Sequence, residues 1–109
     1  MRDAPMVADR TVGVDMGTKL DRVVVYVPAE MPGANVIART RYVIALAFAE
    51  LRDGMDAEPT ADDHAMAAHF WITGPIHTTR VAGVVEDRVT VTADAARVRA
   101  YRAALRAIA

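Results

Sequence analysis

The chain contains neither cysteine nor serine, and these two absences remove several kinds of chemistry. Without cysteine there is no disulfide, no thiolate nucleophile and no cysteine-ligated zinc. Without serine there is no Gly-x-Ser-x-Gly nucleophile elbow, and no threonine stands in a pattern that marks a nucleophile. A Walker-type phosphate loop is also missing. We therefore expect a protein that is not an enzyme and that carries no cofactor.

Large side chains are scarce as well, because only six of the 109 residues are aromatic, whereas 22 are alanine and 15 are valine. A core of small side chains leaves a small domain little margin of stability, so such a chain gains by burying surface against copies of itself. The lone tryptophan, Trp71, is expected in the core or in an interface.

Neither charge nor hydropathy points to a membrane. The net charge is −1, no apolar stretch approaches the length of a membrane span, and the N-terminus lacks the apolar segment of a signal peptide. We expect a cytoplasmic protein with an N-terminal arm, residues 1–10, and a single domain, residues 11–109.

Twelve of its thirteen basic residues are arginine, and this composition resembles products of GC-rich genomes, such as those of actinobacteria and their phages. If the chain is phage-encoded, the compartment is the host cytoplasm.

The first half of the sequence predicts two strands and a helix. Thr11–Met16 alternates apolar and polar residues, and a turn at Gly17–Lys19 would connect it to the β-branched strand Arg22–Val27. Val36–Arg52 is a helix with Asn35 as its N-cap. The helix is apolar on more than one side, so we expect the sheet on one side and either helices or a second subunit on the other.

The second half predicts a short helix, further strands and a final helix. Thr60 and Asp63 approximate a capping box at the start of the short helix. Glu86-Asp87 is expected to be the turn of a hairpin, and either Asp94 or Thr92 is expected to cap the final helix. The predicted elements are helix 61–69, an extended segment near 69–73, strands 76–85 and 88–92, and helix 94–108. The order β-β-α-α-β-β-β-α predicts an α+β fold: a small antiparallel sheet of four or five strands with helices packed on one face.

The final helix carries three different faces. Val98, Tyr101, Leu105 and Ile108 form an apolar stripe that would dock the helix on its own domain. Arginines form a second stripe and alanines a third, which suggests that the helix also meets a second partner. We expect the following residues to bind a partner: Arg99, Arg102, Arg106, Ala100, Ala103 and Tyr42.

Polar clusters offer two weaker sites. His77, Thr79 and Arg80 could bind an anion or phosphate, although strand alternation would place Arg80 on the opposite face from the other two. His64 and His69 are five residues apart, which places them on different sides of a helix, and no metal-binding spacing is present. We expect no metal site.

Three functional hypotheses follow. The first is a non-enzymatic protein–protein interaction or assembly module that forms a homo-oligomer, through the alanine stripes of helix 36–52 or helix 94–108, or binds a host protein. The second is a nucleic-acid-binding regulator that uses the C-terminal arginine face. The third is a small anion- or phosphate-binding enzyme that uses residues 77–80.

Overall fold

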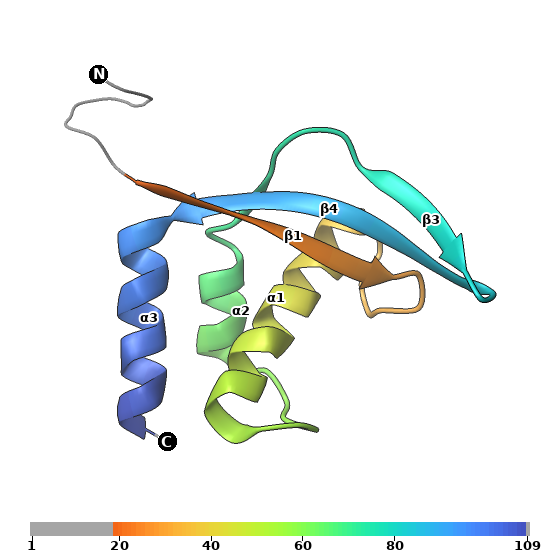
Figure 1. Ribbon diagram of the computed structural model, residues 1–109. Coiled ribbons are helices and arrows are strands. Elements are labelled where there is room, and N and C mark those ends of the chain that lie inside the picture. The colour runs from red at the N-terminus through yellow and green to blue at the C-terminus, as the bar shows by residue number, and fades with distance from the viewer. Residues whose placement is uncertain (1–18, 109) are drawn as a thin grey trace.

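The computed structural model describes residues 19–108, and within them it shows an α+β domain with a small antiparallel sheet and three helices (Figure 1). The elements are β1 (Leu20–Pro28), α1 (Val36–Asp53), α2 (Ala61–Ala67), β2 (Trp71–Ile72), β3 (His77–Val81), β4 (Val84–Asp94) and α3 (Ala95–Ile108). The fold class and the order of the described elements are therefore confirmed. The predicted arm at 1–10, the strand at 11–16 and most of the turn at 17–19 lie outside the described residues.

β4 is the central strand of the sheet. It pairs with β1 along the whole of that strand, from Leu20 opposite Asp94 to Pro28 opposite Glu86. Its other edge is shared by β2 and β3, which pair with different stretches of β4. All three pairings are antiparallel. The valine- and threonine-rich sequence of β4 suits this position, because β-branched side chains pack well on a pleated surface.

All three helices lie on one face of the sheet (Figure 1). Between the sheet and the helices lies the core, to which β4 contributes alternate residues, since successive side chains of a strand point to opposite faces. No helix of residues 19–108 lies on the opposite face of the sheet. The buried core consists of Val27, Ile44, Ala45, Phe48, Met66, Ala67, Phe70, Val89, Val91, Ala93, Val98 and Leu105.

The helix starts follow the predicted caps. The Asn35 side chain accepts a hydrogen bond from the Ala38 N–H at 2.9 Å. Thr60 and Asp63 form the complete reciprocal capping box, and the Asp94 carboxylate accepts from the backbone N–H groups of Ala96 and Arg97. Each of these contacts satisfies helix N–H groups that have no partner within the helix.

The alanines of α1 pack inside the domain. Ala45 and Ala49 are completely buried, and α1 packs along α2, with the Tyr42 ring 5.7 Å from the His64 ring between centroids. Of the two alternatives for the second apolar side of this helix, the structure therefore shows a neighbouring helix. The alanine stripe of α1 is not available to a second chain.

The turn of the second hairpin is not where the sequence suggested. Glu86 and Asp87 lie within β4, and the chain reverses at Ala82-Gly83 instead. Both turn residues have positive φ, 51° and 82°, as tight two-residue hairpins require, and Gly83 adopts that conformation without steric cost. The expectation of a turn at Glu86-Asp87 was wrong because it gave more weight to the two charged residues than to Gly83, the residue that a tight turn favours.

Candidate functional site: an apolar groove beneath the first strand

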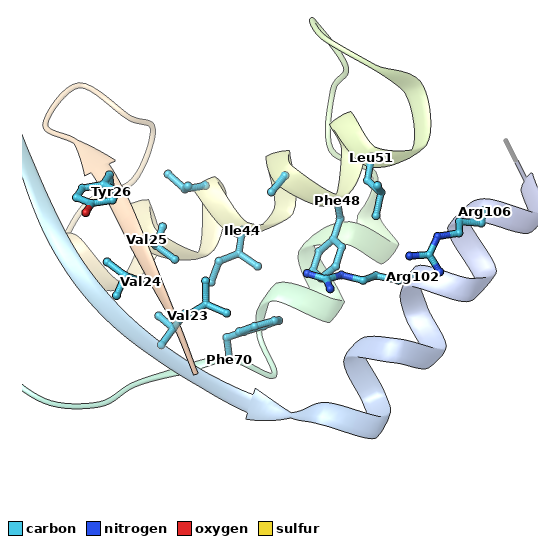
Figure 2. Close-up of a pocket in the computed structure, with 13 residues that line it drawn as sticks. Val23, Val24, Val25, Tyr26, Ile44, Phe48, Leu51, Phe70, Arg102 and Arg106 are labelled. Carbon is cyan, nitrogen blue, oxygen red and sulfur yellow. The ribbon is translucent and has the colours of Figure 1, made fainter. Parts of the chain in front are cut away.

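A groove opens between β1, α1 and α3, on the helix-covered face of the sheet (Figure 2). We call it the β1 groove. Its volume is about 600 Å³, within the range of small-ligand and side-chain binding sites. The lining residues are Val23, Val24, Val25, Tyr26, Val43, Ile44, Ala47, Phe48, Leu51, Phe70, Val91, Arg102 and Arg106.

The groove exists because the other described elements leave part of the apolar face of α1 uncovered. Ile44 and Phe48 reach the core, whereas Leu51, one turn further along, is 48 % exposed. On the strand side, Val23 is in register with the buried Val91 and yet is 43 % exposed. The apolar layer between sheet and helices therefore extends past the closed core to the outer edge of β1, where it meets solvent.

Two arginines of α3 close one end of the β1 groove. Figure 2 shows the side chains of Arg102 and Arg106 extending from α3 toward Phe48 and Leu51. Within residues 19–108, neither guanidinium group lies within salt-bridge distance of a carboxylate. The result is an apolar channel with positive charge at one end, which favours an occupant that combines apolar side chains with a carboxylate.

The structure brings only two of the six predicted partner-binding residues into this groove. Arg99 and Ala103 are exposed on α3 but do not line it. Ala100 borders a separate, shallower hollow between α2 and α3, and Tyr42 packs against His64. The apolar stripe of the same helix was predicted correctly, since Val98 and Leu105 are buried in the core.

The predicted anion site is divided by the sheet. His77, Thr79 and Arg80 are all exposed on β3, where alternation turns Arg80 away from the other two. The Thr79 hydroxyl donates to the backbone oxygen of Glu86 at 3.4 Å, so it faces β4 rather than an open pocket. These three residues do not converge on one point.

A buried polar cluster joins all three helices, and sequence patterns did not reveal it. Asp63 of α2 is completely buried. One of its oxygens accepts hydrogen bonds from the Tyr101 hydroxyl at 2.6 Å and from Arg52 Nη1 at 3.0 Å. The other accepts from the Thr60 N–H at 2.9 Å. The capping role was visible because its partner is three residues away, whereas Tyr101 is 38 residues away and left no periodic signal.

The cluster shifts two pKa values in opposite directions. Burial raises the pKa of Tyr101 to about 12, and its hydrogen bond to the Asp63 carboxylate adds to the rise. Burial also acts to raise the pKa of Asp63, but hydrogen bonds from Thr60, Tyr101 and Arg52 outweigh it, so that the pKa is lowered overall. The charged carboxylate and the neutral phenol are thus the stable forms over a wide pH range.

We expect the cluster to make the protein less stable at high pH. Because the pKa of Tyr101 is about 12 in the folded protein and about 10 in an unfolded chain, its contribution is complete below pH 10 and is lost as the pH rises toward 12. The free energy of unfolding of the wild type should fall over this interval. Tyr101→Phe should be less stable at neutral pH but should lack this fall. An equal fall in both proteins would assign the alkaline loss to other groups.

The described residues offer neither a metal site nor a membrane-spanning helix. No group of three or more histidine, aspartate or glutamate side chains between residues 19 and 108 is arranged to hold a metal ion. In the same part of the chain, no helix has both the length and the hydropathy needed to span a membrane. In comparisons with known proteins, no family model, no curated protein and no solved structure matched this chain.

Proposed function

We propose that this protein is a non-enzymatic association module that binds copies of itself through the outer edge of β1 and the β1 groove. The observation that carries the proposal is an edge strand with an uncharged stretch, Val23–Val27, lying beside an open apolar groove. Within the described residues, β1 pairs with a neighbour on one side only, so its second edge offers unpaired backbone N–H and C=O groups.

The sequence of β1 lacks the usual protection of an edge strand. Soluble proteins keep such edges from pairing by means of lysine, proline, bulges or inward-pointing charges. Here the five residues Val23–Val27 carry no charge, and Pro28 comes only at the end of the strand. Val23 and Val24 point to opposite faces, and each is 43 % exposed. A partner strand added at this edge would cover both.

The β1 groove supplies the second part of the interface. A partner strand beside β1 would place alternate side chains over the groove, where Leu51 and Val23 now face solvent. Arg102 and Arg106 would pair with carboxylates of the partner, which fixes orientation more than it adds affinity. Exposed apolar surface bordered by charge is typical of protein interaction sites.

The same surface would serve a different protein, such as a host protein if the chain is phage-encoded. A second copy is the first candidate because a two-fold axis at the strand edge would pair β1 with itself in antiparallel fashion and join two sheets into one. We place this association in the cytoplasm. The lack of cysteine supports this placement, since the fold needs no oxidising compartment.

Light scattering on the full chain, with nucleic acid removed beforehand, tests the proposal. We expect a stable oligomer at both low and high salt, because strand pairing and apolar burial are little affected by screening. Val24→Lys should give a monomer, since a lysine on an edge strand opposes pairing. The pair Arg102→Glu and Arg106→Glu should weaken the oligomer at low salt.

The matched control for these variants is Arg80→Glu, a charge reversal on the distant β3 hairpin, which should leave the mass unchanged. Circular dichroism would establish that each variant is folded. A wild-type protein that stays monomeric at the highest concentration measured would refute self-association. An oligomer that survives Val24→Lys would place the interface elsewhere.

A further inference from the structure

The face of the sheet opposite the helices presents two aromatic side chains and two arginines. Tyr26 is 55 % exposed and Trp71 45 %, whereas the other four aromatic residues are buried or half-buried. Strand register places Tyr26, Arg88 and His77 in one row across β1, β4 and β3. A second row, formed by Arg22, Thr92 and Trp71, crosses β1, β4 and β2.

The second row shows how close together the side chains on this face lie. Thr92 is only 1 % exposed, although none of the three described helices covers this side of the sheet. Its neighbours in register are Arg22 and Trp71, and its hydroxyl lies 3.0 Å from that of Thr73. These neighbours therefore screen Thr92 from solvent. Trp71 stands at the margin of the sheet, where it also borders a hollow beside Arg41 of α1.

Within the described strands, carboxylates on this face are confined to its two ends. Alternation along β4 assigns Glu86 and Asp94 to the same side as Arg88, and Asp94 already accepts two N–H groups of α3. Between these ends, the rows of Arg88 and Thr92 carry no acidic residue. Within residues 19–108, neither Arg22 nor Arg88 forms a salt bridge.

We propose that this open face is a binding platform for single-stranded nucleic acid, on which Tyr26, His77 and Trp71 stack bases and Arg22 and Arg88 contact phosphates. Aromatic rings stack on any base, and arginines track the backbone, so the combination favours single strands without strong sequence preference. The two rows are four residues apart on β4, roughly 13 Å, so they can hold different bases of one strand. The inference goes beyond the proposed function and uses the face of the sheet opposite the helices. Of the residues that form the platform, Tyr26 at the outer edge of the sheet also lines the β1 groove.

Because the chain has a single tryptophan, Trp71 reports directly on its own surroundings. We expect an oligothymidylate of about ten nucleotides, within the site sizes of single-strand binders, to quench Trp71 fluorescence as it binds. A duplex of equal length should bind much more weakly. The logarithm of the binding constant should fall with the logarithm of salt concentration with a slope of about −1.4, that is about −0.7 for each of two phosphates.

Substitutions on this face and on the opposite face test where the nucleic acid binds. Arg88→Glu should reduce the affinity and bring the salt slope to about −0.7. Its matched control is Arg80→Glu, the same charge change on the same hairpin but on the opposite face, which should bind as the wild type does. Tyr26→Ser should weaken binding roughly 5- to 150-fold through the loss of one stacked base, whereas Tyr26→Phe should retain it.

Several results would overturn the platform. These are no binding at low salt, binding without any change in Trp71 fluorescence, equal affinity for duplex, and equal losses from Arg88→Glu and Arg80→Glu. Loss of binding only in the Arg102→Glu and Arg106→Glu pair would assign nucleic acid to α3 instead. Light scattering on the same samples keeps the two proposals apart, because a monomer that quenches with oligothymidylate refutes self-association alone.

Discussion

Replacing Asp63 by alanine is expected to cost about 3 kcal/mol of the free energy of unfolding, because it breaks a buried ion pair from one side. The substitution removes the acceptor for Thr60, Arg52 and Tyr101 together. Arg52 Nη2 is already buried without a partner, so the guanidinium would keep only Asp53, with which Nε pairs at 2.9 Å. Because the total free energy of unfolding of a small domain is about 5 to 15 kcal/mol, such a loss is severe.

The adjacent Asp62 provides the matched control. It lies in the same first turn of α2 but is exposed, so Asp62→Ala should change the stability by about 0.5 kcal/mol or less. Urea denaturation followed by circular dichroism gives both values. If Asp63→Ala proves too unstable to purify, Asp63→Asn keeps a capping oxygen while removing the charge, and should still be less stable than Asp62→Ala. Equal values for positions 62 and 63 would show that the cluster contributes nothing.

Gly33→Ala is expected to have an effect of similar size, for a steric reason. Gly33 lies against the first turn of α1 with φ of 145°, and an added Cβ would come within 2.6 Å of the Arg39 nitrogen and 2.9 Å of the Ala38 carbonyl carbon. Both are backbone atoms. The Arg39 N–H also donates a hydrogen bond to the backbone carbonyl oxygen of Asn35, at the start of the helix. Strain and overpacking together should cost about 3 kcal/mol.

Gly83 is the control for Gly33, because it shares the positive φ but lacks the steric crowding. It also has positive φ, 82°, but a Cβ at this position would meet no atom within 4 Å. Gly83→Ala should therefore cost only the conformational preference, about 1 kcal/mol. Thermal melts of the two variants beside the wild type make the comparison. If both lower the melting temperature equally, contact with the helix plays no part in the requirement for glycine at position 33.

The features that sequence reasoning predicted are those that depend on neighbours in the chain. The caps at Asn35, Thr60 and Asp94 act on N–H groups two or three residues away, and helical periodicity is likewise local. The β1 groove depends on distances between β1, α1 and α3, which come from different parts of the sequence. Periodicity identified the apolar face of α1 but not that Leu51 lies beyond the reach of the sheet.

The arginine face of the last helix shows the same limit. Arg99, Arg102 and Arg106 are equivalent on a helical projection, yet only the latter two line the groove. Which arginines line the groove depends on where β1 and α1 lie along α3, and the spacing of the arginines in the sequence does not encode this. For Tyr26 and Trp71, alternation in the sequence can show which residues share a face. Strand register was needed to place Tyr26 beside Arg88, and Trp71 in the same row as Arg22.

The central place of β4 has a consequence for synthesis on the ribosome. β1 emerges first, but its partner residues in β4 lie roughly 60 to 75 residues further along the chain. At ordinary elongation rates of about 5 to 20 residues per second, β1 waits roughly 3 to 15 s for that strand. During this interval β4 does not yet cover its edge of the segment Val23–Val27, so both edges of β1 lack a partner from the described strands. The β3–β4 hairpin, by contrast, can close at once through Ala82-Gly83. Nascent chains are therefore most exposed to aggregation before β4 is made, and the last strand of the sheet is the one that ends this exposure.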